Sequence, residues 1–269
     1  MKVTLITGAS SGIGEAFAHR LAREKHNLVL VARSEDKLAV LCDRLMLEHE
    51  VTAHYVAIDL NDYNADERLF KETENHGLEI DWLINNAGFG SMGDFSKLEL
   101  EKELEMIGLN VLALVALTHR YLQQMRERKR GTIINVSSTA SFQPIPFMAT
   151  YAATNAFVSS FSEAVAEENR PYGIRVLSLC PGTTETNFFE ASGIKEPVKI
   201  KGTQTSEEVV EAALNALEKG KSSVVSGWIN YFVTAAGAHT PNSIVTKTIG
   251  GMLRSKVERE DQAKESSAE

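Results

Sequence analysis

The chain has 269 residues, of which 43% are hydrophobic and 24% are charged, and its formal net charge is −8. Such a composition is that of a soluble globular protein, and the length fits one large α/β domain with a sizeable core. The negative charge argues against a nucleic-acid partner, and the lack of a long apolar run argues against a transmembrane span.

Apolar, β-branched segments alternate with helical stretches along the chain, which predicts a single-domain, doubly wound α/β fold with a parallel sheet of about seven strands. The nearly continuous hydrophobicity of the apolar segments is typical of strands buried on both faces. We expect the strands at Val3–Ile6, Leu28–Ala32, His54–Ile58, Trp82–Ile84, Thr132–Val136, Arg175–Leu179 and Ser223–Ser226. We expect the helices at Gly14–Glu24, Asp36–Glu48 (capped by Ser34), Leu98–Arg128 (with a bend at Gly108), Tyr151–Asn169 and Ser206–Lys219.

Residues 228–253 are unusually apolar. An aromatic run from Trp228 to Val233 is followed by a helix expected to begin near Pro241. This segment can cover a substrate pocket, pack on a neighbouring subunit or touch a membrane surface, and we rank these uses in that order because its polar face carries few cations. We assign residues 1–253 to one domain and expect the charged residues 254–269 to form a disordered tail.

Cys42 and Cys180 match no metal-ligand spacing, so we expect two reduced, buried thiols and no metal site. The chain starts with a strand-like run, Lys2–Thr7, and shows no signal-peptide pattern. Both features lead us to expect a cytoplasmic protein.

A glycine-rich loop follows the first strand and opens the first helix, with the sequence Thr7-Gly8-Ala9-Ser10-Ser11-Gly12-Ile13-Gly14. Gly8 permits a tight turn, Gly12 lets the backbone approach a pyrophosphate, and Gly14 lets the helix pack closely on the strand. The N–H groups at the helix N-terminus favour phosphate binding. The loop therefore predicts a dinucleotide site contacted by Gly8, Ser10, Ser11, Gly12, Ile13 and Gly14.

Five further motifs occur in a fixed order over residues 3–190. They are Asn85-Asn86-Ala87-Gly88 after the fourth strand, Asn110 in the long helix, Ser137-Ser138 at the end of the fifth strand, Tyr151, and Pro181-Gly182-Thr183-Thr184-Glu185-Thr186 after the sixth strand. Together with the glycine spacing, this order resembles the short-chain dehydrogenase/reductase family. The resemblance implies a Rossmann fold and a nicotinamide cofactor held also by Asn86, Ala87, Gly88, Asn110, Tyr151, Asn155, Pro181, Gly182, Thr184 and Thr186.

The second strand ends in Arg33-Ser34, with no acidic residue before Glu35. In dinucleotide folds an acidic residue at this point holds the ribose 2′-hydroxyl, whereas an arginine accepts a 2′-phosphate. Arg33, assisted by Ser34, therefore predicts NADP(H) rather than NAD(H). Asp59-Leu60 resembles the family's adenine-contacting pair, although Asp59 could equally form a turn.

By the same resemblance, Tyr151 is the acid in carbonyl reduction and the base in alcohol oxidation, Ser138 polarises the carbonyl, and Asn110 is the active-site asparagine. The family carries a lysine four residues after the tyrosine, and this chain has Asn155 there. An asparagine can still bond ribose hydroxyls or a water, but it has no charge to lower the pKa of Tyr151. We expect activity to be reduced.

Three explanations of Asn155 are open. It is a natural variant with low or altered activity, a substitution introduced to trap a complex, or a change compensated by another cation among Lys195, Lys199 and Lys201. The main alternative function is a catalytically impaired NADP(H)-binding sensor or regulatory protein. An epimerase or lyase fits the glycine spacing and the short length less well.

The residues expected over the nicotinamide are apolar, which suits a small apolar ketone, aldehyde or secondary alcohol. They are Phe89, Met92, Phe142, Pro144, Ile145, Pro146, Phe147, Met148, Phe188 and Phe189, and we expect half of them to serve core packing instead. Residues 98–128 and 151–169 resemble the helix pair through which family members form homodimers and homotetramers. The sequence fixes neither the substrate nor the direction of reaction.

Overall fold

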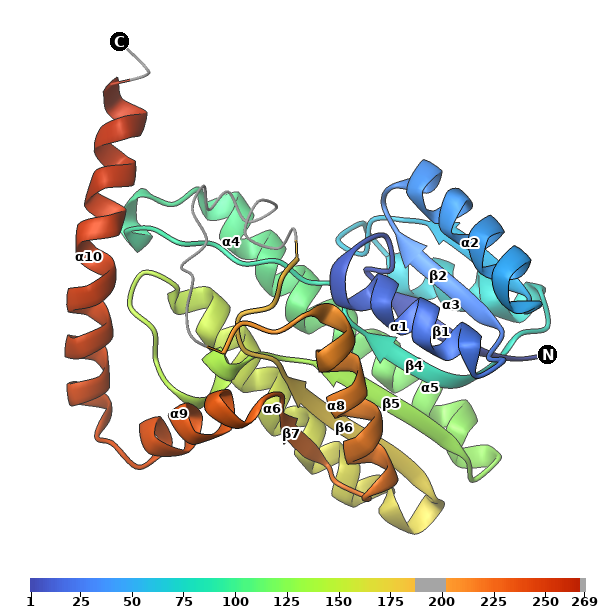
Figure 1. The fold of residues 1–269 in the computed structure, drawn as a ribbon. Coiled ribbons are helices and arrows are strands. Elements are labelled where there is room, and N and C mark those ends of the chain that lie inside the picture. Colours follow the sequence, from blue (N-terminus) through green and yellow to red (C-terminus); the bar gives the residue numbers. More distant parts are fainter. Residues whose placement is uncertain (187–201, 267–269) are drawn as a thin grey trace.

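The computed structural model describes residues 1–186 and 202–266, with side chains up to residue 259. In this part of the chain, seven parallel strands form one sheet in the order β3-β2-β1-β4-β5-β6-β7 (Figure 1). The strands are β1 (Lys2–Thr7), β2 (Leu28–Ala32), β3 (Ala53–Ala57), β4 (Glu79–Asn85), β5 (Gly131–Val136), β6 (Ile174–Cys180) and β7 (Ser223–Val225). The expected strands and the α/β class are confirmed. The strand order reverses between β1 and β4, the place where such sheets bind ligands.

Helices cover both faces of the sheet. On one face, Phe17, Leu45 and Leu217 share an apolar core with the strands, and on the other Leu69 and Tyr121 do so. Burying one such side chain contributes roughly 1.5–3 kcal/mol, so the two cores hold the layers together. The first layer contains α1 (Gly12–Arg23), α2 (Glu35–His49) and α8 (Ser206–Glu218), and the second contains α3 (Ala65–Asn75), α5 (Leu114–Glu127) and α6 (Ala149–Asn169).

The expected helices α1, α2, α6 and α8 are present, with ends that differ from the expected ones by at most two residues. At α8, Thr205 Oγ1 accepts a hydrogen bond from the Glu208 N–H at 3.3 Å, and Glu208 Oε2 accepts one from the Thr205 N–H at 3.0 Å. Ser34 occupies the N-cap position of α2, but its side chain makes no capping bond. Helix α3 was not expected from the sequence, because its apolar stripe is short and charged residues surround it.

The long helix expected over residues 98–128 is divided in the structure. Helix α4 (Leu100–Ile107) leads into a π-helical turn, η2 (Gly108–Ala113), and α5 follows. The bend expected at Gly108 coincides with the start of this turn, where a Cβ atom would lie 2.5 Å from Asn61 Oδ1. A π-helical turn often marks a functional site, and this one carries Asn110.

Two helices form the C-terminal region, α9 (Trp228–Ala238) and α10 (Asn242–Ser266), and α10 runs along one edge of the molecule (Figure 1). Helix α9 was not expected, and α10 continues well beyond residue 253. The structure therefore differs from the disordered tail expected from residue 254, whereas the domain limits stay a prediction. No helix in the described parts of the chain is both long and apolar enough to span a bilayer.

Candidate functional site

The glycine-rich loop is fixed to the loop after β4. Gly8 and Gly12 have φ values of +64° and +60°, which favour glycine because other side chains are strained there. The Thr7 hydroxyl accepts hydrogen bonds from the N–H groups of Asn86 and Ala87 at 2.9 and 3.0 Å. Asn86 Nδ2 in turn donates to the carbonyls of Thr7 and Gly8 at 2.9 and 3.2 Å. These bonds hold the two loops together where the strand order reverses.

Gly14 lets the first turn of α1 pack closely against the Gly8 backbone and the Asn86 side chain. A Cβ atom there would collide with the Gly8 carbonyl oxygen and the Asn86 amide. Gly14→Ala is therefore expected to destabilise the chain by about 1–3 kcal/mol, the usual effect of overpacking. Urea unfolding measures this change. Gly251 is a matched control, since it is also helical with nothing within 4 Å, and its alanine variant is expected to gain up to about 1 kcal/mol. Equal effects of both substitutions would contradict the steric explanation.

Two adjoining cavities open over the ends of the strands. The first, the glycine-loop cavity, has a volume of about 680 Å³. The second, the Tyr151 cavity, has a volume of about 340 Å³ and contains Ser138, Tyr151 and Asn155. Both are lined by Ile13, Asn86, Ala87, Gly88, Phe89 and Thr186. The shared wall makes them two ends of one groove.

Most of the predicted cofactor contacts line this groove. The glycine-loop cavity includes Gly8, Ser10, Ser11, Gly12, Ile13, Arg33, Ser34, Asp59 and Leu60, and the Tyr151 cavity includes Pro181, Gly182, Thr184 and Thr186. Gly14 lines neither cavity and lies beneath the loop. The sequence reasoning missed Asn61, Lys102, Glu105 and Leu109, which also line the glycine-loop cavity. They come from loop and helix positions that carry no motif.

Arg33 reaches into solvent at the end of β2. Its side chain is 79% exposed, and Nη1 lies 3.6 Å from Asp59 Oδ2. Of the two uses considered for Asp59, the turn is present, and the contact with adenine stays a prediction. Its Oδ1 accepts a hydrogen bond from the Asn61 N–H at 2.9 Å, which forms a turn, and the residue also lines the cavity.

Asn110 connects the loop after β4 to α6. Its Oδ1 accepts from the Phe89 N–H at 3.1 Å, and its Nδ2 donates to the Phe89 carbonyl at 2.9 Å and to Thr154 Oγ1 at 3.3 Å. A Cβ atom on Gly88 would lie 2.9 Å from Asn110 Oδ1. Asn110 therefore fixes the backbone between the two cavities.

Ser138 and Tyr151 meet in the Tyr151 cavity. Ser138 follows β5 and caps the short helix η3 (Thr139–Phe142), where its Oγ accepts from the Ala140 N–H at 3.1 Å. Tyr151 lies in the first turn of α6. Burial raises the pKa of the Tyr151 phenol above its ordinary value, and hydrogen bonds with the side chains of Ser138 and Asn155 partly oppose this rise. The phenol is therefore protonated at neutral pH.

Asn155 is buried, with 6% exposure, one helical turn after Tyr151. The Asn155 Nδ2 donates to the Tyr151 backbone carbonyl at 2.8 Å, and the Asn155 backbone carbonyl accepts a hydrogen bond from Ser137 Oγ at 3.0 Å. Among the described residues, no cation contributes to the pKa of Tyr151. Lys195, Lys199 and Lys201, which were considered as substitutes for the family lysine, lie outside the described residues.

The wall of the Tyr151 cavity is largely apolar, as expected. Of the apolar residues named from the sequence, Phe89, Met92, Ile145 and Met148 line it. Phe142, Pro144, Pro146 and Phe147 do not, and Phe188 and Phe189 lie outside the described residues. The sequence reasoning did not single out Gln143, or Asn230 and Thr234 from α9 and Lys256 from α10. The C-terminal helices thus contribute to the cavity, the first of the three uses considered for them.

The two cysteines are free and buried, as expected. Burial, with a smaller contribution from Asp43, raises the pKa of Cys42 to about 11. Cys180 Sγ lies 3.5 Å from the hydroxyls of Ser159 and Ser178. Neither cysteine lines the two cavities.

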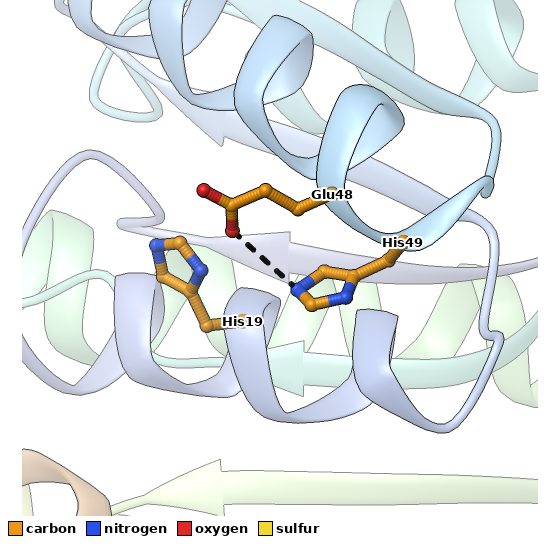
Figure 2. Close-up of side chains that lie close together, drawn as sticks. All are labelled: His19, Glu48 and His49. Atoms are coloured by element: carbon orange, nitrogen blue, oxygen red, sulfur yellow. Dashed lines mark ion pairs between the residues drawn. The ribbon is translucent and has the colours of Figure 1, made fainter.

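One side-chain cluster away from the groove has metal-ligand chemistry. Figure 2 shows His19 of α1 beside Glu48 and His49 of α2, and their ligand atoms lie within 4.8 Å of one another. Burial chiefly lowers the pKa of His19, and the charges of Arg44 and Arg23 add to this effect, whereas the carboxylates of Glu15 and Glu48 oppose it. Because the cluster lines neither of the two cavities, we assign no metal to it.

A model of the short chain dehydrogenase family matches residues 2–197. The chain is a short-chain dehydrogenase. This dehydrogenase is 34% identical over 226 residues to the 7beta-hydroxysteroid dehydrogenase of Mediterraneibacter gnavus, which covers 83% of the chain and 85% of that relative. It is 30% identical over 250 residues to the very-long-chain 3-oxoacyl-CoA reductase of Rattus norvegicus, which covers 87% and 78% of the two chains.

The dehydrogenase also resembles a solved structure, the short-chain dehydrogenase from Sphingobium yanoikuyae in complex with NADPH. The TM-score is 0.78 at 33% identity, and the match covers 84% of this chain and 87% of the other. The family assignment makes the protein an oxidoreductase that uses a nicotinamide cofactor on a carbonyl or alcohol compound.

Proposed function

We propose that this dehydrogenase uses NADP(H) to interconvert an apolar carbonyl compound and its alcohol. The juxtaposition of Ser138, Tyr151 and Asn155 in an apolar cavity carries the proposal, since this cavity adjoins the glycine-loop cavity. The names of the two relatives denote a steroid and a very-long-chain acyl group, which are both large apolar skeletons. They support a substrate of the same character.

The described residues fit NADP(H). Gly8 and Gly12 leave the loop without side chains where it faces the cavity, and the N-terminus of α1 begins there. Arg33 and Ser34 line the same cavity at the end of β2, where a 2′-phosphate would lie. The bound cofactor supplies or accepts the hydride.

Each residue then has a separate task in reduction. The Ser138 hydroxyl donates a hydrogen bond to the substrate carbonyl oxygen and polarises it. The protonated Tyr151 phenol transfers its proton to the same oxygen as negative charge develops. Asn110 acts as a positioning residue through its bonds to Phe89 and Thr154. In alcohol oxidation the Tyr151 phenolate takes the proton back.

NADPH consumption with a panel of apolar carbonyl compounds tests the proposal, beside a titration of NADPH binding. Steroid ketones and long-chain 3-oxoacyl thioesters form two arms of the panel. Turnover of any of these compounds with NADPH supports the oxidoreductase. Tight NADPH binding without turnover supports the alternative of a cofactor-binding sensor, which the uncharged Asn155 favours.

Arg33→Gln is expected to weaken NADPH binding by about 10- to 100-fold and to leave NADH binding nearly unchanged. A charge-assisted hydrogen bond to the 2′-phosphate contributes about 1.5–3 kcal/mol, and NADH lacks that phosphate. Fluorescence titration with both cofactors gives the two Kd values. Arg68 is a matched control, since it is also exposed and pairs with Asp62 at 2.9 Å but lines neither cavity. Similar losses of NADPH and NADH affinity would show that Arg33 does not bind the 2′-phosphate.

We also propose that the dehydrogenase is a homodimer or homotetramer. Leu104 of α4, Leu112 of η2 and Phe157 of α6 are 57%, 64% and 44% exposed. Large apolar side chains that are exposed together on neighbouring helices are typical of subunit interfaces. Light scattering at micromolar concentration measures the oligomeric state.

A further inference from the structure

Lys256 is the only Lys, Arg, His, Asp or Glu among the described residues that line the Tyr151 cavity. The other described residues of the wall carry apolar or neutral polar side chains. The other cations on the described part of α10, Lys247, Arg254 and Arg259, are exposed, whereas Lys256 is half-buried. Lys256 thus brings the one charged side chain among these residues to the cavity that holds Ser138 and Tyr151.

Helix α10 is held against the site by several contacts. The Arg254 guanidinium lies 5.8 Å from the centre of the Phe147 ring. A Cβ atom on Gly250 would lie 3.5 Å from Pro146, and Val257 is only 3% exposed. The neighbours of Arg254 and Gly250 show that α10 packs on the segment between η3 and α6.

The side of α10 that carries Lys256 is otherwise apolar. Val245, Ile249 and Lys256 are spaced by four and seven residues, so they lie on one side of the helix. Val245 is 8% exposed, and Ile249 is half-buried. A single cation at the end of an apolar stripe is expected to contribute to ligand selection as well as to packing.

Lys256 does not replace the family lysine, whose position Asn155 occupies in this chain. Among the described residues, the pKa of Tyr151 responds to burial and to Ser138 and Asn155, with no contribution from an ammonium group. Lys256 therefore does not act on the phenol as the family lysine would. Lys256 also interacts with a neighbouring group, so a substrate anion would exchange one partner for another, which limits the gain in affinity.

We infer that Lys256 forms an anion-binding subsite in the Tyr151 cavity, and that the substrate is an apolar carbonyl compound that carries a carboxylate. This inference rests on the proposed function, since it places the carbonyl at Ser138 and Tyr151. The apolar wall binds the skeleton, and the ammonium group forms a charge-assisted hydrogen bond with the carboxylate. A carboxylate fits better than a phosphate dianion, because the one cation among the described residues of this cavity cannot offset two charges in apolar surroundings.

Calorimetric titration of the full chain, with and without NADP⁺, tests the subsite independently of turnover. Octanoate is expected to bind roughly tenfold more tightly than octanamide, and octyl phosphate more weakly than octanoate. In Lys256→Gln the preference for octanoate over octanamide disappears while octanamide binding is unchanged, and in Lys256→Arg the preference persists. The control Lys247→Gln, on the exposed side of α10, keeps the wild-type pattern.

Equal affinity for octanoate and octanamide in the wild-type chain overturns the inference, as does a preference that survives in Lys256→Gln. Tighter binding of octyl phosphate overturns the carboxylate assignment. In a kinetic arm, an oxo-octanoate with its ketone far from the carboxylate is compared with the corresponding amide. Lys256→Gln is expected to raise KM for the acid about tenfold, with kcat and the KM of the amide unchanged. An octanoate preference without reduction of any ketone contradicts the proposed function and leaves the subsite standing.

Discussion

Replacing Tyr151 by phenylalanine is expected to lower kcat for carbonyl reduction by roughly 10²- to 10⁴-fold, the contribution of a positioned proton donor. The substitution removes the hydroxyl that forms hydrogen bonds with Ser138 and Asn155, while the ring still fills its place in the cavity. NADPH affinity is expected to fall by less than about tenfold, because one neutral hydrogen bond contributes about 0.5–1.5 kcal/mol. Steady-state rates and a binding titration give the two numbers.

Tyr63→Phe is the control for this experiment. Tyr63 is 89% exposed and lines neither cavity, so its variant is expected to keep wild-type rates and NADPH affinity. A Tyr151→Phe enzyme with near-wild-type kcat would show that another group donates the proton. A large loss of NADPH affinity would show instead that the phenol serves mainly to hold the cofactor.

Asn155→Lys is expected to raise the rate of alcohol oxidation at neutral pH by roughly 10- to 1000-fold. In the proposed mechanism, oxidation requires the Tyr151 phenolate, and burial places the pKa of this phenol above its ordinary value. A nearby cation favours the phenolate and lowers the pKa by about one to three units, so the phenolate fraction at pH 7 rises by the same factor. In the same mechanism, reduction uses the protonated phenol, which is already abundant, so the rate of reduction is expected to gain less.

The pH profile separates this effect from a change in cofactor binding. In the chain with Asn155, oxidation is expected to rise about tenfold per pH unit through the neutral range, and the variant reaches its plateau at a lower pH. Asn155→Met introduces a side chain of about the length of lysine but without a charge, and it is expected to keep the original pH profile. Because Asn155 is buried, thermal unfolding should be followed in parallel to detect loss of folded protein. An unchanged profile in Asn155→Lys would falsify the view that a missing cation limits oxidation.

The features that could be predicted well from the sequence are determined by residues that are adjacent in the chain. β2 was expected at Leu28–Ala32 and has those bounds, because a strand buried on both faces has an almost purely apolar sequence. The glycine-rich loop was recognisable for a similar reason, since Gly8 and Gly12 adopt backbone conformations that other residues avoid. Local chemistry was sufficient in both cases.

Features that depend on contacts between distant segments were not predictable in the same way. The π-helical turn around Asn110 accompanies side-chain bonds to Phe89 and Thr154, and no local pattern specifies these partners. Helix α9 is rich in aromatic and β-branched residues, which favour strands in isolation. Lys256 is an ordinary surface lysine by sequence, and only the packing of α10 brings it to the cavity.

The two ends of the groove draw on different parts of the chain. Every described residue that lines the glycine-loop cavity lies between Gly8 and Thr186, whereas the Tyr151 cavity also receives side chains from α9 and α10. We therefore expect mutations in the last two helices to alter which compounds are accepted while the glycine-loop cavity keeps its sequence. Substrate range in this protein is open to evolutionary drift, or to deliberate exchange of the C-terminal segment, without renewed selection for cofactor affinity.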